Sequence, residues 1–312
     1  MRMEPSSLYR KTINNSLFRQ AVIVWIFLGS LSLYGQQFYF DQFSVSDGLA
    51  QSTVYKIIQD RNDMYWLGTR AGVSSFEGAN FVNYTALDGL AEKGVRAICE
   101  DQNGLIWFGH TGGGISLYNG STFRVIPSPA AQNHSSITSI EMDSAHNLWF
   151  TTEGAGVMRL SNPEAHPDHF LFVQYSGSEL SDQVYGHHVD RGGRSYFITD
   201  LGVKYFNPDS SRFDKLMLNG VPKFYQATSI LVDTREQTWL GTYHGGLYRY
   251  NPDVDSSLMY DLVKAGLNSN WISTLFEDRE GNIWAGTFEG GMARISPDNK
   301  LELFNTSHGF PG

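Results

Sequence analysis

Acidic, basic and aromatic side chains recur at one kind of position along this chain of 312 residues. Each directly follows a short aromatic segment and precedes a glycine-rich turn. Side chains of these types bind polar ligands through hydrogen bonds, stack on sugar rings or hold a catalytic metal ion. The candidates are Arg70, His110, Glu153, Asp200, Tyr243, His244, Phe288 and Glu289, together with Trp271 just before the last apolar segment. We predict that they form a ligand-binding face; the alternative is that they are solvated loop residues.

A motif repeated six times must position these side chains. Each copy has an Asp at a first turn and an aromatic residue six positions later. The pairs are Asp60/Trp66, Asp101/Trp107, Asp143/Trp149, Asp190/Tyr196, Asp233/Trp239 and Asp278/Trp284. Successive aromatic residues are 41, 42, 47, 43 and 45 positions apart, which is the period of β-propeller blades. We interpret these twelve residues as structural: the Asp fixes the turn and the aromatic ring fills the space between blades.

Each repeat contains four short segments rich in Val, Ile, Trp, Phe and Tyr and bounded by Gly, Asn and Asp, which predicts four strands. The chain is therefore predicted to be all-β, a β-propeller over residues 36–312. The blades are expected near 54–84, 95–126, 137–175, 184–216, 227–261 and 272–304. The candidate side chains then lie in loops between the second and third strands, except Trp271, which lies in the loop that leads into the first strand of the last blade. They differ from repeat to repeat while the Asp and Trp positions recur.

Catalytic and metal-binding motifs are not evident in the sequence. Asp101-Gln-Asn-Gly104 resembles the start of a calcium loop, but position twelve is Gly112 instead of the bidentate Glu that such a loop needs. Neither a Gly-x-Ser-x-Gly elbow nor a His-Glu-x-x-His motif occurs. We therefore predict no cofactor, no metal and no catalytic residue.

The N-terminal segment has the pattern of an export signal. Four basic residues precede the apolar run AVIVWIFLGSLSLY, which is too short to span a bilayer comfortably. Residues 1–35 are predicted to be a signal peptide, so the mature chain would be periplasmic, with an uncleaved anchor as the alternative. Residues 36–312 carry 19 basic and 31 acidic residues. This negative charge argues against nucleic-acid binding.

The two ends of the repeat series raise the question of how the ring closes. Residues 38–43 and 301–304 both read as fourth strands. The first of these would belong to a blade whose other strands lie beyond residue 312. We expect a C-terminally truncated part of a seven-bladed ring; a six-bladed ring with a redundant strand is the alternative.

The phrases VRAICEDQNGLIWFGHTGGGISLY (95–118) and ISTLFEDREGNIWAGTFEGGMARI (272–295) resemble the two-component regulator propeller repeat. The third repeat departs from the pattern with Thr151 in place of a glycine, and the fourth with His187 and Tyr196. The resemblance implies the periplasmic sensor region of a Bacteroidetes-type hybrid histidine kinase. Its ligand would be a small molecule such as an oligosaccharide. Its partners in an intact gene product would be further propeller blades and a histidine kinase region.

Two other functions remain open at the level of sequence. The first is a protein-interaction scaffold, because one propeller fold serves many functions. The second is an enzyme, since Leu148-Trp-Phe-Thr-Thr-Glu153 is similar to blades of the streptogramin B lyase family. In that interpretation His110, Glu153, His244 and Glu289 would be the catalytic set. Because the chain has no kinase core and no catalytic motif, we predict a sensor that is not itself an enzyme.

Overall fold

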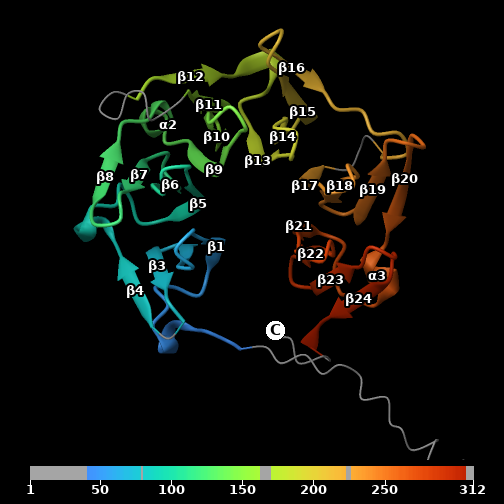
Figure 1. Cartoon of the computed structure of the whole chain (residues 1–312), viewed down its shortest axis with the longest axis horizontal. Helices are drawn as coiled ribbons and strands as arrows, with labels where there is room; N and C mark the ends of the chain where they lie inside the picture. Colours follow the sequence, from blue (N-terminus) through green and yellow to red (C-terminus); the bar gives the residue numbers. More distant parts are fainter. Residues whose placement is uncertain (1–40, 79, 162–169, 223–225, 307–312) are drawn as a thin grey trace, which may run out of the picture. The chain divides into compact units, whose positions relative to one another are not determined.

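The computed structural model describes residues 41–78, 80–161, 170–222 and 226–306. The predicted signal peptide at 1–35 lies outside these residues. The described chain forms six antiparallel sheets of four strands each (Figure 1). In chain order the sheets are β1 Val54–Gln59, β2 Tyr65–Thr69, β3 Gly72–Phe76 and β4 Phe81–Tyr84; β5 Val95–Glu100, β6 Ile106–His110, β7 Ile115–Tyr118 and β8 Phe123–Ile126; β9 Ser136–Met142, β10 Leu148–Glu153, β11 Val157–Leu160 and β12 Phe172–Tyr175; β13 Val184–Val189, β14 Ser195–Thr199, β15 Gly202–Asn207 and β16 Arg212–Lys215; β17 Ala227–Val232, β18 Thr238–Thr242, β19 Leu247–Asn251 and β20 Ser256–Tyr260; β21 Ile272–Glu277, β22 Ile283–Thr287, β23 Gly291–Ile295 and β24 Leu301–Phe304.

Each sheet follows its neighbour in the way the blades of a propeller do. Within a sheet, spatial order equals chain order, so consecutive strands pair as hairpins. The first strands contact one another in the series β1, β5, β9, β13, β17 and β21, and Figure 1 shows them on the inner side. The predicted all-β propeller of four-stranded blades is confirmed.

The repeated Asp performs two tasks in every sheet. In the second sheet, Asp101 Oδ1 accepts the backbone N–H groups of Asn103 at 2.9 Å and Leu105 at 3.0 Å. Its Oδ2 accepts the indole N–H of Trp107 at 2.9 Å. The equivalent ring donates to the equivalent Asp in the other five sheets, including the Tyr196 hydroxyl to Asp190 at 3.0 Å. The spacing of six residues therefore places a hydrogen-bond donor over the carboxylate of the turn.

The aromatic ring of one sheet packs on the residue that follows the aromatic position in the next sheet. The ring pairs are Trp66–Phe108 at 5.7 Å, Trp107–Phe150 at 6.0 Å and Trp149–Phe197 at 5.4 Å between centroids. The buried clusters accordingly combine residues of adjacent sheets. Burying one Trp ring removes roughly 200 Å² from water, worth about 5 kcal/mol at 25 cal/mol per Å². These interfaces hold the blades together.

Glycine at the start of the third strand is required by the neighbouring fourth strand. Gly156 has φ +74°, and a Cβ there would lie 2.1 Å from the Tyr175 carbonyl oxygen. Gly291 has φ +94°, with the Phe304 carbonyl oxygen 2.2 Å from a Cβ. Any L side chain would therefore be strained by its backbone and would also clash with the adjacent strand.

Short helices occupy the segment before β1 and several connections between successive sheets. They are the 3-10 turns η1 Val45–Asp47, η2 Ala86–Asp88 and η3 Gly177–Glu179 and the helices α2 Pro129–Gln132 and α3 Leu262–Ala265. No helix in the described ranges is long and apolar enough to cross a membrane.

Residues 41–43 do not form the strand that the sequence predicts at 38–43. Residues 38–40 lie outside the described part. The Phe43 ring instead packs on Phe76 and Phe81, with centroids 5.0 and 5.8 Å away.

His187 stands in the apolar interior between the third and fourth sheets. Its imidazole stacks on Phe197 with centroids 4.4 Å apart and lies 6.4 Å from the Trp149 ring. Neither ring nitrogen has a hydrogen-bond partner within the described structure. Burial lowers the pKa of His187 well below the usual value of 6.5. The ring is therefore a neutral core residue, and its polar atoms cost stability.

We expect His187→Ile to raise the free energy of unfolding by about 1–2 kcal/mol at pH 7. The equivalent residues Ile98, Ile140 and Ile230 are buried isoleucines in three other sheets. Because the histidine pKa is lower in the folded protein than in the unfolded chain, the wild type loses stability as pH falls below 6.5. The advantage of the variant should therefore grow in acid. Urea unfolding of wild type and His187→Ile at pH 7.5 and pH 5 measures this, with the surface substitution His134→Gln as control. If the stability difference between His187→Ile and wild type were the same at both pH values, the prediction would be contradicted.

Candidate ligand-binding site

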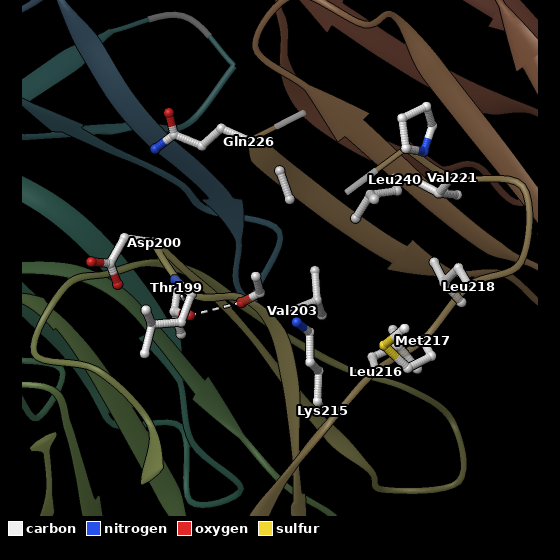
Figure 2. A pocket seen from close by; sticks show the side chains of 14 residues that line it. Thr199, Asp200, Val203, Lys215, Leu216, Met217, Leu218, Val221, Gln226 and Leu240 are labelled. Carbon is white, nitrogen blue, oxygen red and sulfur yellow. Dashed lines mark hydrogen bonds between the residues drawn. The ribbon is translucent and has the colours of Figure 1, made fainter. Parts of the chain in front are cut away.

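The antiparallel order of strands places two kinds of loop at the same end of each sheet. These are the turns from second to third strand and the connections from fourth strand to the next first strand. A cavity of about 470 Å³ lies on this face between the fourth and fifth sheets (Figure 2). The turn between β14 and β15, the segment after β16 and the start of β17 line it. The first of these segments carries Asp200, one of the residues predicted for ligand binding.

The cavity has a polar and an apolar part. Asp200 and Gln226, from different segments, lie on one side of the lining, whereas Leu216, Met217 and Leu218 lie on the other (Figure 2). The exposed Asp200 carboxylate accepts the Ser181 hydroxyl at 2.5 Å, which fixes its orientation. Met217 is 59% exposed. A mainly apolar hollow with a few oriented polar groups is typical of small-molecule sites.

Three aromatic rings stack beside this cavity on the fifth and sixth sheets. We call Tyr243, Trp271 and Phe288 the aromatic stack. The Trp271 ring lies 4.4 Å from Tyr243 at 63° and 4.3 Å from Phe288 at 27°, measured between centroids. Tyr243 is 37% and Phe288 47% exposed. The Tyr243 backbone N–H donates to the Gln226 carbonyl at 2.9 Å, so the stack adjoins the lining of the cavity.

Six of the predicted site residues lie on this part of the molecule. Asp200 lines the cavity, and Tyr243, Trp271 and Phe288 belong to the aromatic stack. The exposed His244 ring lies 3.9 Å from Tyr243. Glu289 is exposed next to Phe288, with a positive φ of 57°. Residues from three repeats therefore meet around one region.

The other three predicted residues lie elsewhere. Arg70 is exposed on the first sheet. Glu153 forms an ion pair with Arg96 at 3.0 Å. His110 corrects the sequence interpretation, because it is fully buried inside the second sheet and its Nε2 lies 2.8 Å from the Ser116 hydroxyl. Burial lowers the pKa of His110 to about 4, so it stays neutral near pH 7.

Several residues of the cavity were not found from the sequence. Leu216, Met217, Val221 and Gln226 line it but belong to the connection after β16. The only local signal was the apolar run Leu216-Met217-Leu218 outside a strand. The way this segment folds over the neighbouring turn depends on tertiary packing.

A second group of titratable side chains lies on the first strands of three sheets. Burial raises the pKa of Glu141 to about 7, although the nearby Lys56 charge acts in the opposite direction. Glu141 accepts the Val189 backbone N–H at 2.9 Å. Burial also lowers the pKa of His188, whose Nε2 accepts the Val232 N–H at 3.0 Å. Both residues therefore tie one sheet to the next.

These acids and histidines do not assemble into a metal site. Over the described residues, no three His, Cys, Asp or Glu side chains are grouped so that they could hold one metal ion. The Asp turns use their carboxylates for backbone amides and the aromatic donor, as the second sheet shows.

Two segments of the chain are similar to a known repeat. The model of the two-component regulator propeller family matches residues 89–112 and 266–289. A stretch of 65 residues is 42% identical to histidine kinase P4 of Formosa agariphila. That match covers 20% of this chain and only 5% of the length of the kinase.

Solved structures with this fold include proteins of different functions. Streptogramin B lyase superposes with a TM-score of 0.65 at 14% identity, over 86% of this chain and 87% of the lyase. PorZ, a surface component of the type IX secretion system of Porphyromonas gingivalis, gives 0.62 at 21% identity, over 77% of this chain and 38% of PorZ. At these identities the comparisons establish the propeller fold alone.

Proposed function

We propose that this chain is the sensor propeller of a two-component signalling system and binds an extracellular small molecule, such as an oligosaccharide. The observation that carries the proposal is the partly exposed aromatic stack beside a cavity with oriented polar groups. The two propeller repeats and the local likeness to a histidine kinase support the signalling role. Signal transfer would require a kinase region that these 312 residues do not contain.

Sugar chemistry fits the site for two reasons. The C–H face of a pyranose packs on an aromatic ring, and Trp271 and Phe288 lie nearly parallel at 27°. The hydroxyl groups of the sugar require donors and acceptors within reach. Asp200 can accept, Lys215 can donate, and Gln226 can do both. An oligosaccharide could therefore extend from the cavity to the aromatic stack.

The fold of streptogramin B lyase makes an enzyme the second candidate. The catalytic residues of such an enzyme would be His110, Glu153, His244 and Glu289 in this chain. They are spread over four sheets: His110 is buried against Ser116, and Glu153 pairs with Arg96. This distribution favours the sensor over a lyase-like reaction.

An exported location accompanies the proposed function. The basic and apolar pattern of residues 1–35 supports a signal peptide. A ligand such as an extracellular oligosaccharide would then reach the propeller in the periplasm. The negative charge of residues 36–312 suits a neutral or cationic ligand better than an anionic one.

Trp271→Ala is expected to weaken oligosaccharide binding by about 10- to 100-fold. A thermal-shift screen of residues 36–312 identifies the sugar, since a ligand at 100 times its Kd stabilises the folded state by about 2.7 kcal/mol. Calorimetric titration then compares wild type, Trp271→Ala and Asp200→Asn. Tyr55→Ala, which removes an exposed aromatic ring on the first sheet, is the control and should bind as wild type does. Absence of any thermal shift, or unchanged affinity in Trp271→Ala, would refute the proposed site.

A further inference from the structure

An arginine lies opposite the repeat Trp in three of the six sheets. The register pairs are Trp149/Arg159, Trp239/Arg249 and Trp284/Arg294. In each pair the guanidinium lies over the indole, with 5.5 to 5.6 Å between its carbon atom and the ring centroid. The negative face of the ring attracts the cation. This contact fixes the guanidinium but uses none of its N–H groups as donors to an oxygen.

Two of these arginines direct a terminal nitrogen to a side-chain oxygen. Arg294 forms an ion pair with Glu302, its neighbour on the fourth strand. Arg249 donates to Asn299, in the turn between β23 and β24 of the next sheet. The fold therefore supplies both guanidinium groups with an acceptor.

Arg159 differs, because the described residues offer it no such oxygen. Its neighbour on the fourth strand is Val173, where the sixth sheet has Glu302. No hydrogen bond or ion pair joins its guanidinium to any described residue, and its Nε is enclosed without an acceptor. Two further rings, Tyr175 and Phe206, lie 5.7 and 5.6 Å from its guanidinium carbon. Three rings thus hold a cation whose N–H donors have no acceptor among the described residues.

This guanidinium lines a second cavity, of about 520 Å³, between the third and fourth sheets. The turns after β9, β13 and β15 form the lining. The cavity therefore lies at the end of the sheets opposite the candidate ligand-binding site. Ser144 and Ser195 add hydroxyl groups to the lining. Arg194 adds a second guanidinium, which lies over the Tyr205 ring at 5.3 Å. The volume is that of a small-molecule site.

The charged side chains of the lining set the charge of a ligand. They are Arg159, Arg194, Asp143 and Asp209. The Asp143 carboxylate is already occupied, since it accepts the Trp149 indole and two backbone N–H groups. Asp209 is exposed in the turn after β15. The lining thus lacks the negative excess of residues 36–312 as a whole, and a ligand with one negative charge suits it better than one with two.

We propose that this cavity binds the carboxylate of a small hydroxy acid, with Arg159 as its anchor. A guanidinium binds a planar carboxylate through two parallel N–H···O bonds, which are stronger than bonds between neutral groups. The three rings orient the group before the ligand arrives, so little side-chain freedom is lost on binding. Ser144, Ser195 and Arg194 can bond to the hydroxyl groups of the acid. The site is separate from the sugar site proposed above and does not depend on it.

Gluconate is the probe, because it carries one carboxylate on a hydroxylated chain. Sorbitol is the matched neutral compound. NMR of the isotope-labelled full chain follows the Nε–Hε resonances of the arginines, and the Arg159 resonance is the one that Arg159→Leu lacks. At constant ionic strength we expect gluconate to shift this resonance and to raise Tm, and sorbitol at the same concentration to do neither.

Substitutions at two equivalent positions test the anchor. Arg159→Leu should weaken gluconate binding at least about tenfold. Leucine suits the position, because the second sheet has Leu117 opposite Trp107. Arg159→Lys, which keeps the charge but lacks the fork, should weaken binding by about three- to tenfold. Arg249→Leu is the matched control and should bind gluconate as the wild type does, since that arginine already donates to Asn299.

Several results would overturn the proposal. Gluconate might leave the Arg159 resonance unshifted, Arg159→Leu could keep the wild-type affinity, or Arg249→Leu could lose as much. An equal response to sulfate would make the cavity a general anion site. Binding of gluconate only after Glu164→Gln and Asp168→Asn, at positions outside the described part, would identify an acidic side chain of this chain as the occupant.

Discussion

Asp101→Ala is expected to lower the free energy of unfolding by about 3–4 kcal/mol. The carboxylate is 2% exposed and accepts three hydrogen bonds, from the Asn103 and Leu105 amides and from the Trp107 indole. Alanine would leave the indole N–H of a fully buried ring without an acceptor. It would also release the turn between β5 and β6. Urea unfolding followed by circular dichroism measures the loss.

Asp278→Ala is the matched control, because it removes the equivalent two backbone bonds and the indole bond from the sixth sheet, together with two bonds from the Asn282 side-chain amide. Trp284 is only half-buried, so its freed N–H can bond to water, and we expect a loss of about 1–2 kcal/mol. Equal losses in the two variants would show that the turn alone matters and that the bond to the buried indole adds nothing. A loss below 1 kcal/mol in Asp101→Ala would refute the structural role of the pair.

Glu141→Gln should make the protein more stable above pH 7, by up to about 3 kcal/mol. Burial raises the pKa of Glu141 from 4.5 to about 7. The unfolded chain ionises near 4.5, so the stability that the protonated carboxyl contributes is fully present below that pH. It is lost as pH rises through 7. Glutamine keeps an oxygen to accept the Val189 N–H and has no charge to desolvate.

Unfolding curves at pH 4.5, 6 and 8 test this dependence. Wild type and Glu141→Gln should have similar stability at pH 4.5 and diverge at pH 8. Glu280→Gln, a change at an exposed turn, should follow the wild type at every pH. If the difference in free energy of unfolding between wild type and Glu141→Gln did not change with pH, the pKa of Glu141 would be the same in the folded and the unfolded chain.

The sequence by itself determined the repeat, the four strands of each blade and the turn at each Asp. These features depend on residues close together in the chain, such as Asp101 and the two backbone N–H groups that donate hydrogen bonds to it. Local hydrogen bonds and strand periodicity therefore predict them. The spacing of six between Asp and aromatic residue was also visible. Its reason, a hydrogen bond between the two side chains, appears only when the second strand pairs back on the turn.

Tertiary structure alone decided which candidate side chains meet. Tyr243, Trp271 and Phe288 come from two repeats and stack because their loops end at the same edge of adjacent sheets. His110 lies one position earlier in its repeat, where the fifth and sixth sheets have Thr242 and Thr287. Its ring turns into its own sheet, where Ser116 offers a partner. The exposure of Ile57 and Phe276, on the first and sixth sheets, likewise follows from which sheet has a neighbour. A repeat determines the position of a side chain within its blade, but burial and contacts depend on what the adjacent blades place against it.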